Sequence, residues 1–279
     1  MLRLLKIEWN KIYYYKATRI FTIIYFVILL AIGGILALIK PEVGGMKLDI
    51  AKLGTFDFPV VWQNISFLVA IAKIFIAVII ITNVTNEFSN RTLKQNLIDG
   101  LSKKEFLTSK ILTNLIFASL STLFVLGICL FLGLTFSSSE EGIFKGMEYM
   151  GAYFLKMNLF FSIALFLAIL LRKAAFAFLG LIVLWMGEGM VSTVEFLLKA
   201  WMEKGLEKVD PYGVFISNYL PLNTSSKLID MPKMSMEGFV FGGSVFKYSP
   251  VDWTFVVAGI IYTFVFLFFS YRLLKKRDL

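Results

Sequence analysis

The segment Glu87–Lys110, EFSNRTLKQNLIDGLSKKEFLTSK, decides how the rest of the chain is arranged. It is polar, it has the patterning of a helix, and it lies between two long apolar stretches. The hydrocarbon core of a bilayer cannot solvate such a segment, so it must lie in water between two membrane spans. It carries five Lys/Arg against three acids, which favours the positive side of the membrane.

The rest of the chain has the composition of a membrane domain. Of its 279 residues, 58% are hydrophobic and only 17% are charged, whereas a soluble domain carries about 25% charged residues. Six apolar stretches reach the length of about 20 residues that a span requires. We therefore expect one all-α integral membrane domain over residues 1–279. Its predicted transmembrane helices are residues 20–39, 60–81, 111–136, 152–171, 174–198 and 251–271.

Basic residues orient these spans. If Met1 is inside, the inside segments hold sixteen Lys/Arg against five acids, and the outer segments hold more acids than bases. The positive-inside rule then predicts that both termini are cytoplasmic. The first apolar run lacks a small-residue cleavage site at its end, so we do not expect a cleaved signal peptide.

Two further segments flank the spans. Residues 1–16 are expected to form an interfacial helix, with an apolar face separate from its basic one. That apolar face comprises Leu2, Leu5, Trp9, Ile12 and Tyr13. Residues 199–250 form a large outer region before the last span. Their apolar content predicts that part of it dips into the outer leaflet as short helices.

Several classes of site and partner are disfavoured. The chain has no His and one Cys, Cys129, so a protein-built metal site and an internal disulfide are not expected. The net charge of +9 is spread over alternate loops as an orientation signal. No continuous basic stripe on a soluble fold is present, so we expect no nucleic-acid partner.

The cytoplasmic loop, residues 86–103, has defined helix signals. Gly100 suits a helix C-terminus because glycine tolerates positive φ, and Ser102 with Glu105 forms a capping box that would start the next helix. Leucines lie on one side of the first helix and polar residues on the other. The simpler alternative is that this basic loop forms a helix that lies on the lipid headgroups and binds no protein. The stop and start signals, and exposed Leu mixed with Arg and Asp, favour a protein partner.

At these residues the chain resembles the permeases of ABC-2-type ABC transporters. The matching residues are Glu87, Arg91-Thr92-Leu93-Lys94, Ser102-Lys103-Lys104 and Phe106-Leu107 to Lys110. The six spans, the N-terminal helix and the large outer region extend the resemblance over most of the chain. The resemblance implies that this loop is a coupling helix seated on an ATPase subunit and that two permease subunits pair. The residues it implies as ATPase contacts are Glu87, Arg91, Leu93, Leu97, Ile98, Asp99, Gly100 and Leu101.

Unlike fused members of that group, this chain contains no G-x-x-x-x-G-K-[ST] phosphate loop. ATP and Mg are therefore expected on a separate ATPase subunit, with no cofactor in this chain, and the chain itself is not expected to be an enzyme. The resemblance places it in a bacterial cytoplasmic membrane as the permease of an exporter. The alternative is an ATP-independent channel, a secondary transporter or a membrane scaffold.

Two ionisable residues stand out inside the spans. Lys73 lies in the second span and Glu188 in the fifth. A charge at mid-bilayer costs about 2.5–3.5 kcal/mol on insertion scales, so both side chains should face protein or water. They are expected either to pair with each other or to line a translocation path. Gly187 and Gly189 beside Glu188 would let a neighbouring helix approach closely.

Overall fold

The protein is a bundle of long helices in the computed structural model, which describes residues 2–38, 42–43, 46–47, 54–137, 142–205, 209–210, 213, 215–234 and 245–277. Its α-helices are α1 (Leu2–Tyr14), α2 (Lys16–Leu38), α3 (Val60–Val69), α4 (Lys73–Ser89), α5 (Thr92–Ile98), α6 (Lys103–Phe136), α7 (Glu148–Leu171), α8 (Ala174–Met202), α9 (Pro221–Lys227) and α11 (Trp253–Lys276).

Six short elements complete the described part. The 3-10 helix η2 (Ala70–Ala72) joins α3 to α4, and η4 (Ile216–Tyr219) precedes α9. Strand β1 (Glu42–Val43) pairs antiparallel with β2 (Met46–Lys47), and β3 (Lys233–Met234) with β4 (Phe246–Lys247). The residue pairs Gly44-Gly45 and Gly242-Gly243 lie outside the described residues.

Among the described residues, six helical segments are long and apolar enough to cross a membrane, as the architecture of a multi-pass membrane protein requires. They coincide with the six predicted spans, but several extend further into polar sequence. The third, α6, begins at Lys103 rather than at residue 111, and the second continues to Ser89. Hydropathy locates only the apolar part of a helix, whereas backbone hydrogen bonds and caps set its ends.

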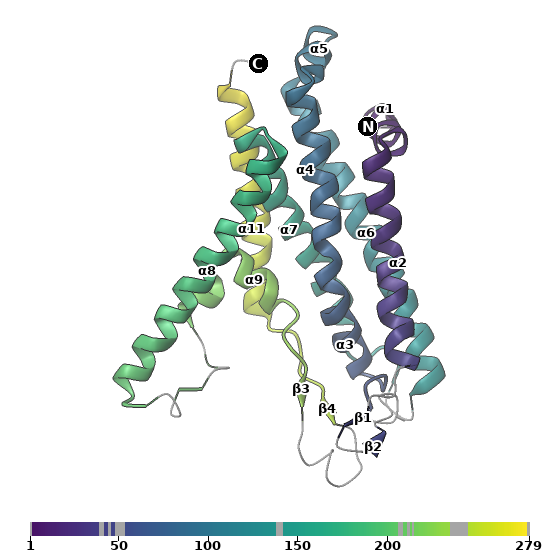
Figure 1. Ribbon diagram of the computed structural model, residues 1–279, viewed down its shortest axis with the longest axis vertical. Helices are drawn as coiled ribbons and strands as arrows, with labels where there is room; N and C mark the ends of the chain where they lie inside the picture. The colour runs from purple at the N-terminus through teal and green to yellow at the C-terminus, as the bar shows by residue number, and fades with distance from the viewer. Residues whose placement is uncertain are drawn as a thin grey trace.

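Helix α7 is the centre of the bundle and contacts α3, α4, α6, α8, α9 and α11. Tyr153 of α7 shares hydroxyl hydrogen bonds with Ser121 of α6, at 3.0 Å, and Tyr25 of α2, at 3.3 Å. These bonds bring the first, third and fourth spans together. Helix α8 diverges from the bundle, and α5 lies at the same end as both termini (Figure 1).

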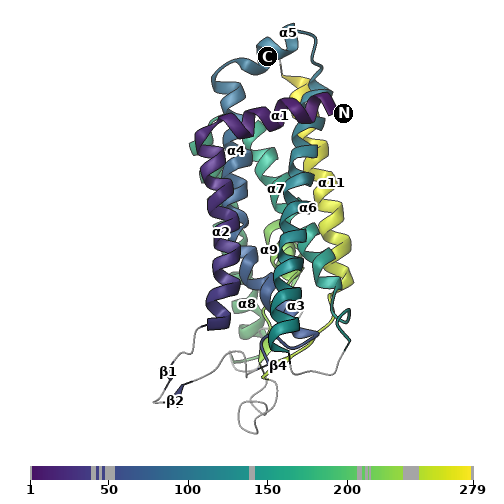
Figure 2. The same cartoon turned by 90° about the vertical axis from the view of Figure 1, so that its right-hand side faces the viewer.

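Helix α1 crosses that end of the bundle at a steep angle to α2 (Figure 2). A helix is present where residues 1–16 predict one, but only part of its predicted apolar stripe packs on the protein, through Ile12. Trp9 and Tyr13 are 61% and 54% exposed, while Glu8 is only 2% exposed. Helix α1 therefore docks through a buried polar residue and leaves its aromatic residues on the outside.

Candidate functional site

The α5 end of the bundle carries a short helix with a precise stop. Gly100 has φ +96°, and the amides of Gly100 and Leu101 donate to the carbonyls of Leu97 (3.2 Å) and Asn96 (2.9 Å). This is the Schellman pattern, in which a residue with positive φ satisfies the last carbonyls of a helix. The predicted stop at Gly100 is confirmed.

The next helix starts with the predicted capping box. The Ser102 hydroxyl accepts from the Glu105 amide at 3.1 Å, and the Glu105 carboxylate accepts from the Ser102 amide at 2.8 Å. Because α6 runs without a break from Lys103 to Phe136, only the tight turn of residues 99–102 separates α5 from a full membrane-length helix. Displacement of α5 therefore acts directly on α6.

The eight residues predicted to contact an ATPase divide into three groups by exposure. Arg91, Ile98, Asp99 and Gly100 are exposed, and the Ile98 side chain is 75% exposed. Leu97 and Leu101 are partly buried and pack on the bundle core.

Glu87 and Leu93, in contrast, are 4% and 2% exposed. They lie under the surface, which corrects the prediction that their side chains touch a partner. Glu87 is drawn inward by two lysines, and Leu93 packs into the apolar core.

Beneath α5 lies a buried ionic cluster, formed by Glu8 and Lys11 of α1, Glu87 of α4 and Lys110 of α6. The Lys110 ammonium group is 2.7 Å from Glu8 Oε2 and also forms an ion pair with Glu87. Lys11 bridges the same carboxylates, at 3.0 Å from Glu8 and 2.9 Å from Glu87. Two carboxylates and two ammonium groups thus bring α1, α4 and α6 to one point.

Asn83 and Ser109 complete the cluster. The Asn83 amide donates to Glu8 Oε2 at 3.1 Å and accepts from Lys110 at 3.3 Å. The Ser109 hydroxyl donates to Glu8 Oε1 at 3.4 Å. Among the described residues Glu87 Oε2 has no hydrogen-bond partner. The network therefore satisfies almost all of its buried polar atoms, as a stable buried network requires.

The electrostatics of α1 follow from this geometry. Burial raises the pKa of Glu8, but the Lys110 and Lys11 charges outweigh it, so the net pKa lies below the ordinary value. Burial lowers the pKa of Lys11, and the Glu8 and Glu87 charges reverse this, so its net pKa lies above the ordinary value. Both groups are therefore charged at neutral pH.

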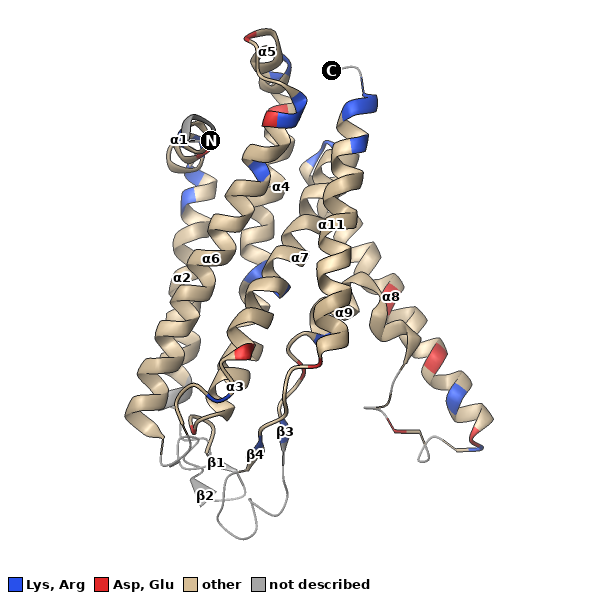
Figure 3. Ribbon diagram, turned by 180° about the vertical axis from the view of Figure 1, so that it is seen from behind, with Lys and Arg blue, Asp and Glu red and all other residues tan. Residues whose placement is uncertain are grey.

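Sequence reasoning did not identify this cluster. Glu8 and Lys11 are three residues apart on α1, which is a visible helical pair, but their partners lie 76 to 102 residues further along the chain. Nothing in the sequence pairs Glu8 with Lys110. Lys and Arg gather at this end of the molecule, around α5 and the two termini (Figure 3).

The predicted pairing of Lys73 with Glu188 is wrong. Glu188, 7% exposed, accepts hydrogen bonds from the backbone amides of Leu222 at 3.0 Å and Asn223 at 2.8 Å. These amides open α9, and a carboxylate there satisfies donors that the helix cannot. Lys73 instead lies with its ammonium group 4.5 Å from the centroid of the Phe160 ring.

The glycines beside Glu188 admit no neighbouring helix among the described residues. A Cβ added at Gly187 or Gly189 would meet nothing within 4 Å. Their proposed role in close packing is therefore wrong for this conformation. Glu195, one to two turns further along α8, accepts from the amides of Ile216 and Ser217, both at 2.7 Å. Helix α8 thus carries two carboxylates that hold η4 and α9.

Lys156 is a third interior charge, missed at the sequence level although its place in the apolar run 152–171 is visible. It is 4% exposed in α7, and it donates to the carbonyls of Ser226 at 3.2 Å and Ile229 at 3.4 Å. Helix α9 is therefore held at its start by Glu188 and at its end by Lys156. The expected short helices of the outer region are present as η4 and α9.

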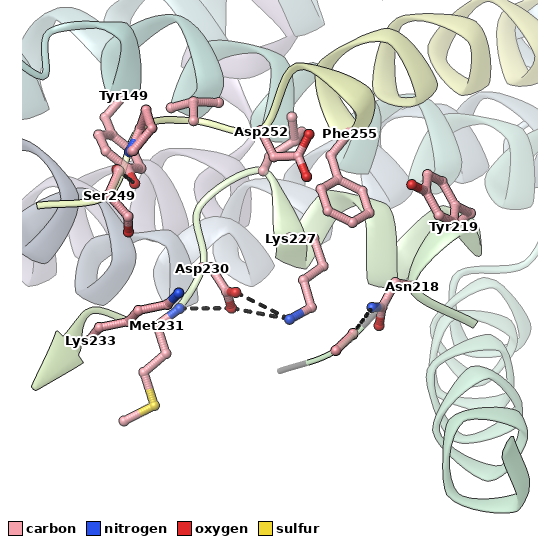
Figure 4. Close-up of a pocket in the computed structure, with 14 residues that line it drawn as sticks. Tyr149, Asn218, Tyr219, Lys227, Asp230, Met231, Lys233, Ser249, Asp252 and Phe255 are labelled. Atoms are coloured by element: carbon pink, nitrogen blue, oxygen red, sulfur yellow. Dashed lines mark hydrogen bonds and ion pairs between the residues drawn. The ribbon is translucent and has the colours of Figure 1, made fainter. Parts of the chain in front are cut away.

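A pocket of about 220 Å³ lies beside the end of α9 (Figure 4). Lys227 and Asp230 lie in it as an ion pair, 3.2 Å apart. Tyr149, Asp252 and Phe255 line other parts of it. Within the described residues no group of three or more His, Cys, Asp or Glu side chains could hold a metal ion.

Comparisons with known proteins add one match. The family described as "Protein of unknown function (DUF2705)" matches residues 50–279. That range includes the α5 end from Glu87 to Lys110, the interior charges and α9, but it excludes α1. No curated protein matches the chain.

Proposed function

The chain belongs to the DUF2705 family, whose function is unknown, and from its geometry we propose that it is the permease subunit of an ATP-binding cassette exporter. Its spans would form the translocation path, and a separate ATPase subunit would bind ATP and Mg²⁺ and supply the energy. A second permease copy or a homologue would complete the membrane part. The chain itself would carry out no ATP hydrolysis.

The observation that carries the proposal is the construction of the α5 end. A short helix with an exposed isoleucine, Ile98, is held between a Schellman stop and a capped helix start. The buried ionic cluster ties its base to α1 and α6. A helix that only rested on lipid headgroups would not require such rigid joints. A partner that pushes α5 could transmit force through them to the bundle.

The distribution of charge supports the orientation. Both termini lie at the α5 end (Figure 1), and that end carries most of the basic residues (Figure 3). The positive-inside rule then favours a cytoplasmic α5 in a bacterial inner membrane, where a soluble ATPase can reach it. The exposed aromatic residues of α1 would lie among the lipid headgroups.

The test is co-purification of the tagged chain from its native membrane in gentle detergent. We expect a soluble subunit with a phosphate loop and ATPase activity to accompany it in stoichiometric amount. Ile98→Asp should abolish that association while membrane insertion is unchanged, because the side chain faces outward. Phe144→Asp is the matched control, since Phe144 is 78% exposed at the opposite end. Equal recovery of the ATPase with both variants would refute the coupling role.

If the chain co-purifies with stoichiometric partners and none of them is an ATPase, the result would support the alternative class of ATP-independent channels, secondary transporters and scaffold subunits. Leu97→Asp is a less specific test, because Leu97 packs partly on the core and its replacement also perturbs the fold.

A further inference from the structure

Two lysines of neighbouring helices, the half-buried Lys73 of α4 and the buried Lys156 of α7, have no carboxylate in contact with them among the described residues. The ammonium group of Lys73 lies over the Phe160 ring, and Phe160 is one helical turn from Lys156 on α7. The hydrogen-bond partners of Lys156 are two carbonyl oxygens. Carbonyl dipoles satisfy its donors but do not neutralise its charge.

The carboxylates of this region are engaged elsewhere. Glu188 accepts from the two amides that open α9. Asp230 forms its ion pair with Lys227. In the part of the chain that the structure describes, α4 and α7 therefore carry two ammonium groups to which no carboxylate is bound. Buried charges without a partner are costly in a membrane protein and mark functional sites.

Unsatisfied polar atoms lie in the helices that flank these lysines. Gln63 Oε1 and Ser66 Oγ of α3, and Ser225 Oγ of α9, are buried without a hydrogen-bond partner among the described residues. A buried polar atom without a hydrogen-bond partner is destabilising. The Gln63 amide nitrogen also reaches the carbonyl of Asp230 at 3.2 Å. Gln63 and Lys156 thus hold the same turn, residues 226–230, from two sides.

We propose that Lys73 and Lys156 bind the anionic headgroup of an amphiphilic cargo, with the hydroxyl groups of Ser66 and Ser225 as further donors. This inference rests on the proposed transport function. The two ammonium groups supply charge and donors for phosphate or carboxylate oxygens. The surrounding spans are apolar, which suits the tail of an amphiphile.

In the present conformation the turn of residues 226–230 holds the Lys156 ammonium group through the carbonyls of Ser226 and Ile229. Lys227, Leu228 and Asp230 of the same turn line the pocket beside α9 (Figure 4). An anion that binds the Lys156 ammonium group would displace the carbonyl oxygens of Ser226 and Ile229 as its hydrogen-bond acceptors. Binding would therefore release the end of α9 and open the site toward that pocket.

The test uses the purified full-length chain in phosphatidylcholine nanodiscs, with dodecyl phosphate as the anionic probe and dodecanol as its uncharged counterpart. We expect dodecyl phosphate to raise the thermal unfolding midpoint and dodecanol to leave it almost unchanged. Lys73→Met should weaken the apparent affinity at least tenfold, and Lys73→Arg should preserve it. Lys73 has no hydrogen bond to lose, so Met should keep its apolar contact and the fold.

The matched control is Lys173→Met, which removes one positive charge from an exposed position between α7 and α8. It should bind dodecyl phosphate as the parent chain does. Equal affinities for Lys73→Met and Lys173→Met, or equal stabilisation by dodecanol, would overturn the proposal. This binding needs no ATPase, so it fails or succeeds independently of the co-purification experiment.

Discussion

Replacement of Lys110 by methionine tests the buried ionic cluster that joins α1 to the bundle. Lys110 is 2% exposed and forms ion pairs with both Glu8 and Glu87. Without it, two carboxylates remain with Lys11 alone, and the cluster changes from neutral to one net negative charge. Removal of one partner from a buried ion pair costs about 3–5 kcal/mol. Since about 1.4 kcal/mol is a tenfold change in an equilibrium, the undocked population of α1 should rise at least about a hundredfold.

Hydrogen exchange of the α1 amides, measured in nanodiscs, reports this population directly. We expect α1 protection to fall about a hundredfold in Lys110→Met while α7 in the bundle centre keeps most of its protection. Lys104→Met is the control, because Lys104 is exposed on the same helix.

Adding Glu8→Gln should partly rescue the variant, since a neutral Glu87–Lys11 pair then remains, with a coupling of about 0.5–3 kcal/mol. Unchanged α1 protection in Lys110→Met, or strict additivity in the double variant, would refute the docking role.

Two further predictions concern the same end of the molecule. Because the pKa of Glu8 lies below its ordinary value of 4.5, its contribution to α1 docking is present above pH 4.5. It is lost as the pH falls through the lowered value, so the protection factors of the α1 amides, corrected for the intrinsic exchange rate, should fall only in acid. A loss of α1 protection near neutral pH would contradict this. Gly100→Ala should destabilise the α5 turn by about 1–2 kcal/mol. Its φ is +96° and an added Cβ meets nothing within 4 Å, so the cost is conformational. Exchange of the α5 amides measures it, and unchanged α5 protection would contradict it.

The six spans and the α5 turn could be predicted because they depend on local sequence. A long apolar run requires a helix in lipid wherever it occurs. The stop at Gly100 and the start at Ser102 depend on residues at most five positions apart. The helix ends in polar sequence were less accurate, because hydropathy does not register a helix that continues into water.

The buried charges could not be predicted in the same way. Glu8 meets Lys110 across 102 residues, and Glu188 meets α9 across 34. The sequence suggested Lys73 as a partner for Glu188 by depth alone, but the true partners were backbone amides, which carry no signature in a side-chain pattern. Lys156 was overlooked although its place in the apolar run 152–171 is visible. Its carbonyl partners lie 70 and 73 residues away, in α9 and the following turn, and the sequence does not indicate them.

Sequence alone therefore determined that the chain is a multi-pass helical membrane protein with a sharply capped polar turn, because hydrophobicity and capping act over a few residues. Tertiary structure decided which charges are neutralised and which remain. A buried charge takes whatever group the packed helices bring within about 3 Å. That choice placed Glu87 in an internal joint rather than on a surface. Within the described part of the chain, it left Lys73 and Lys156 without a carboxylate partner.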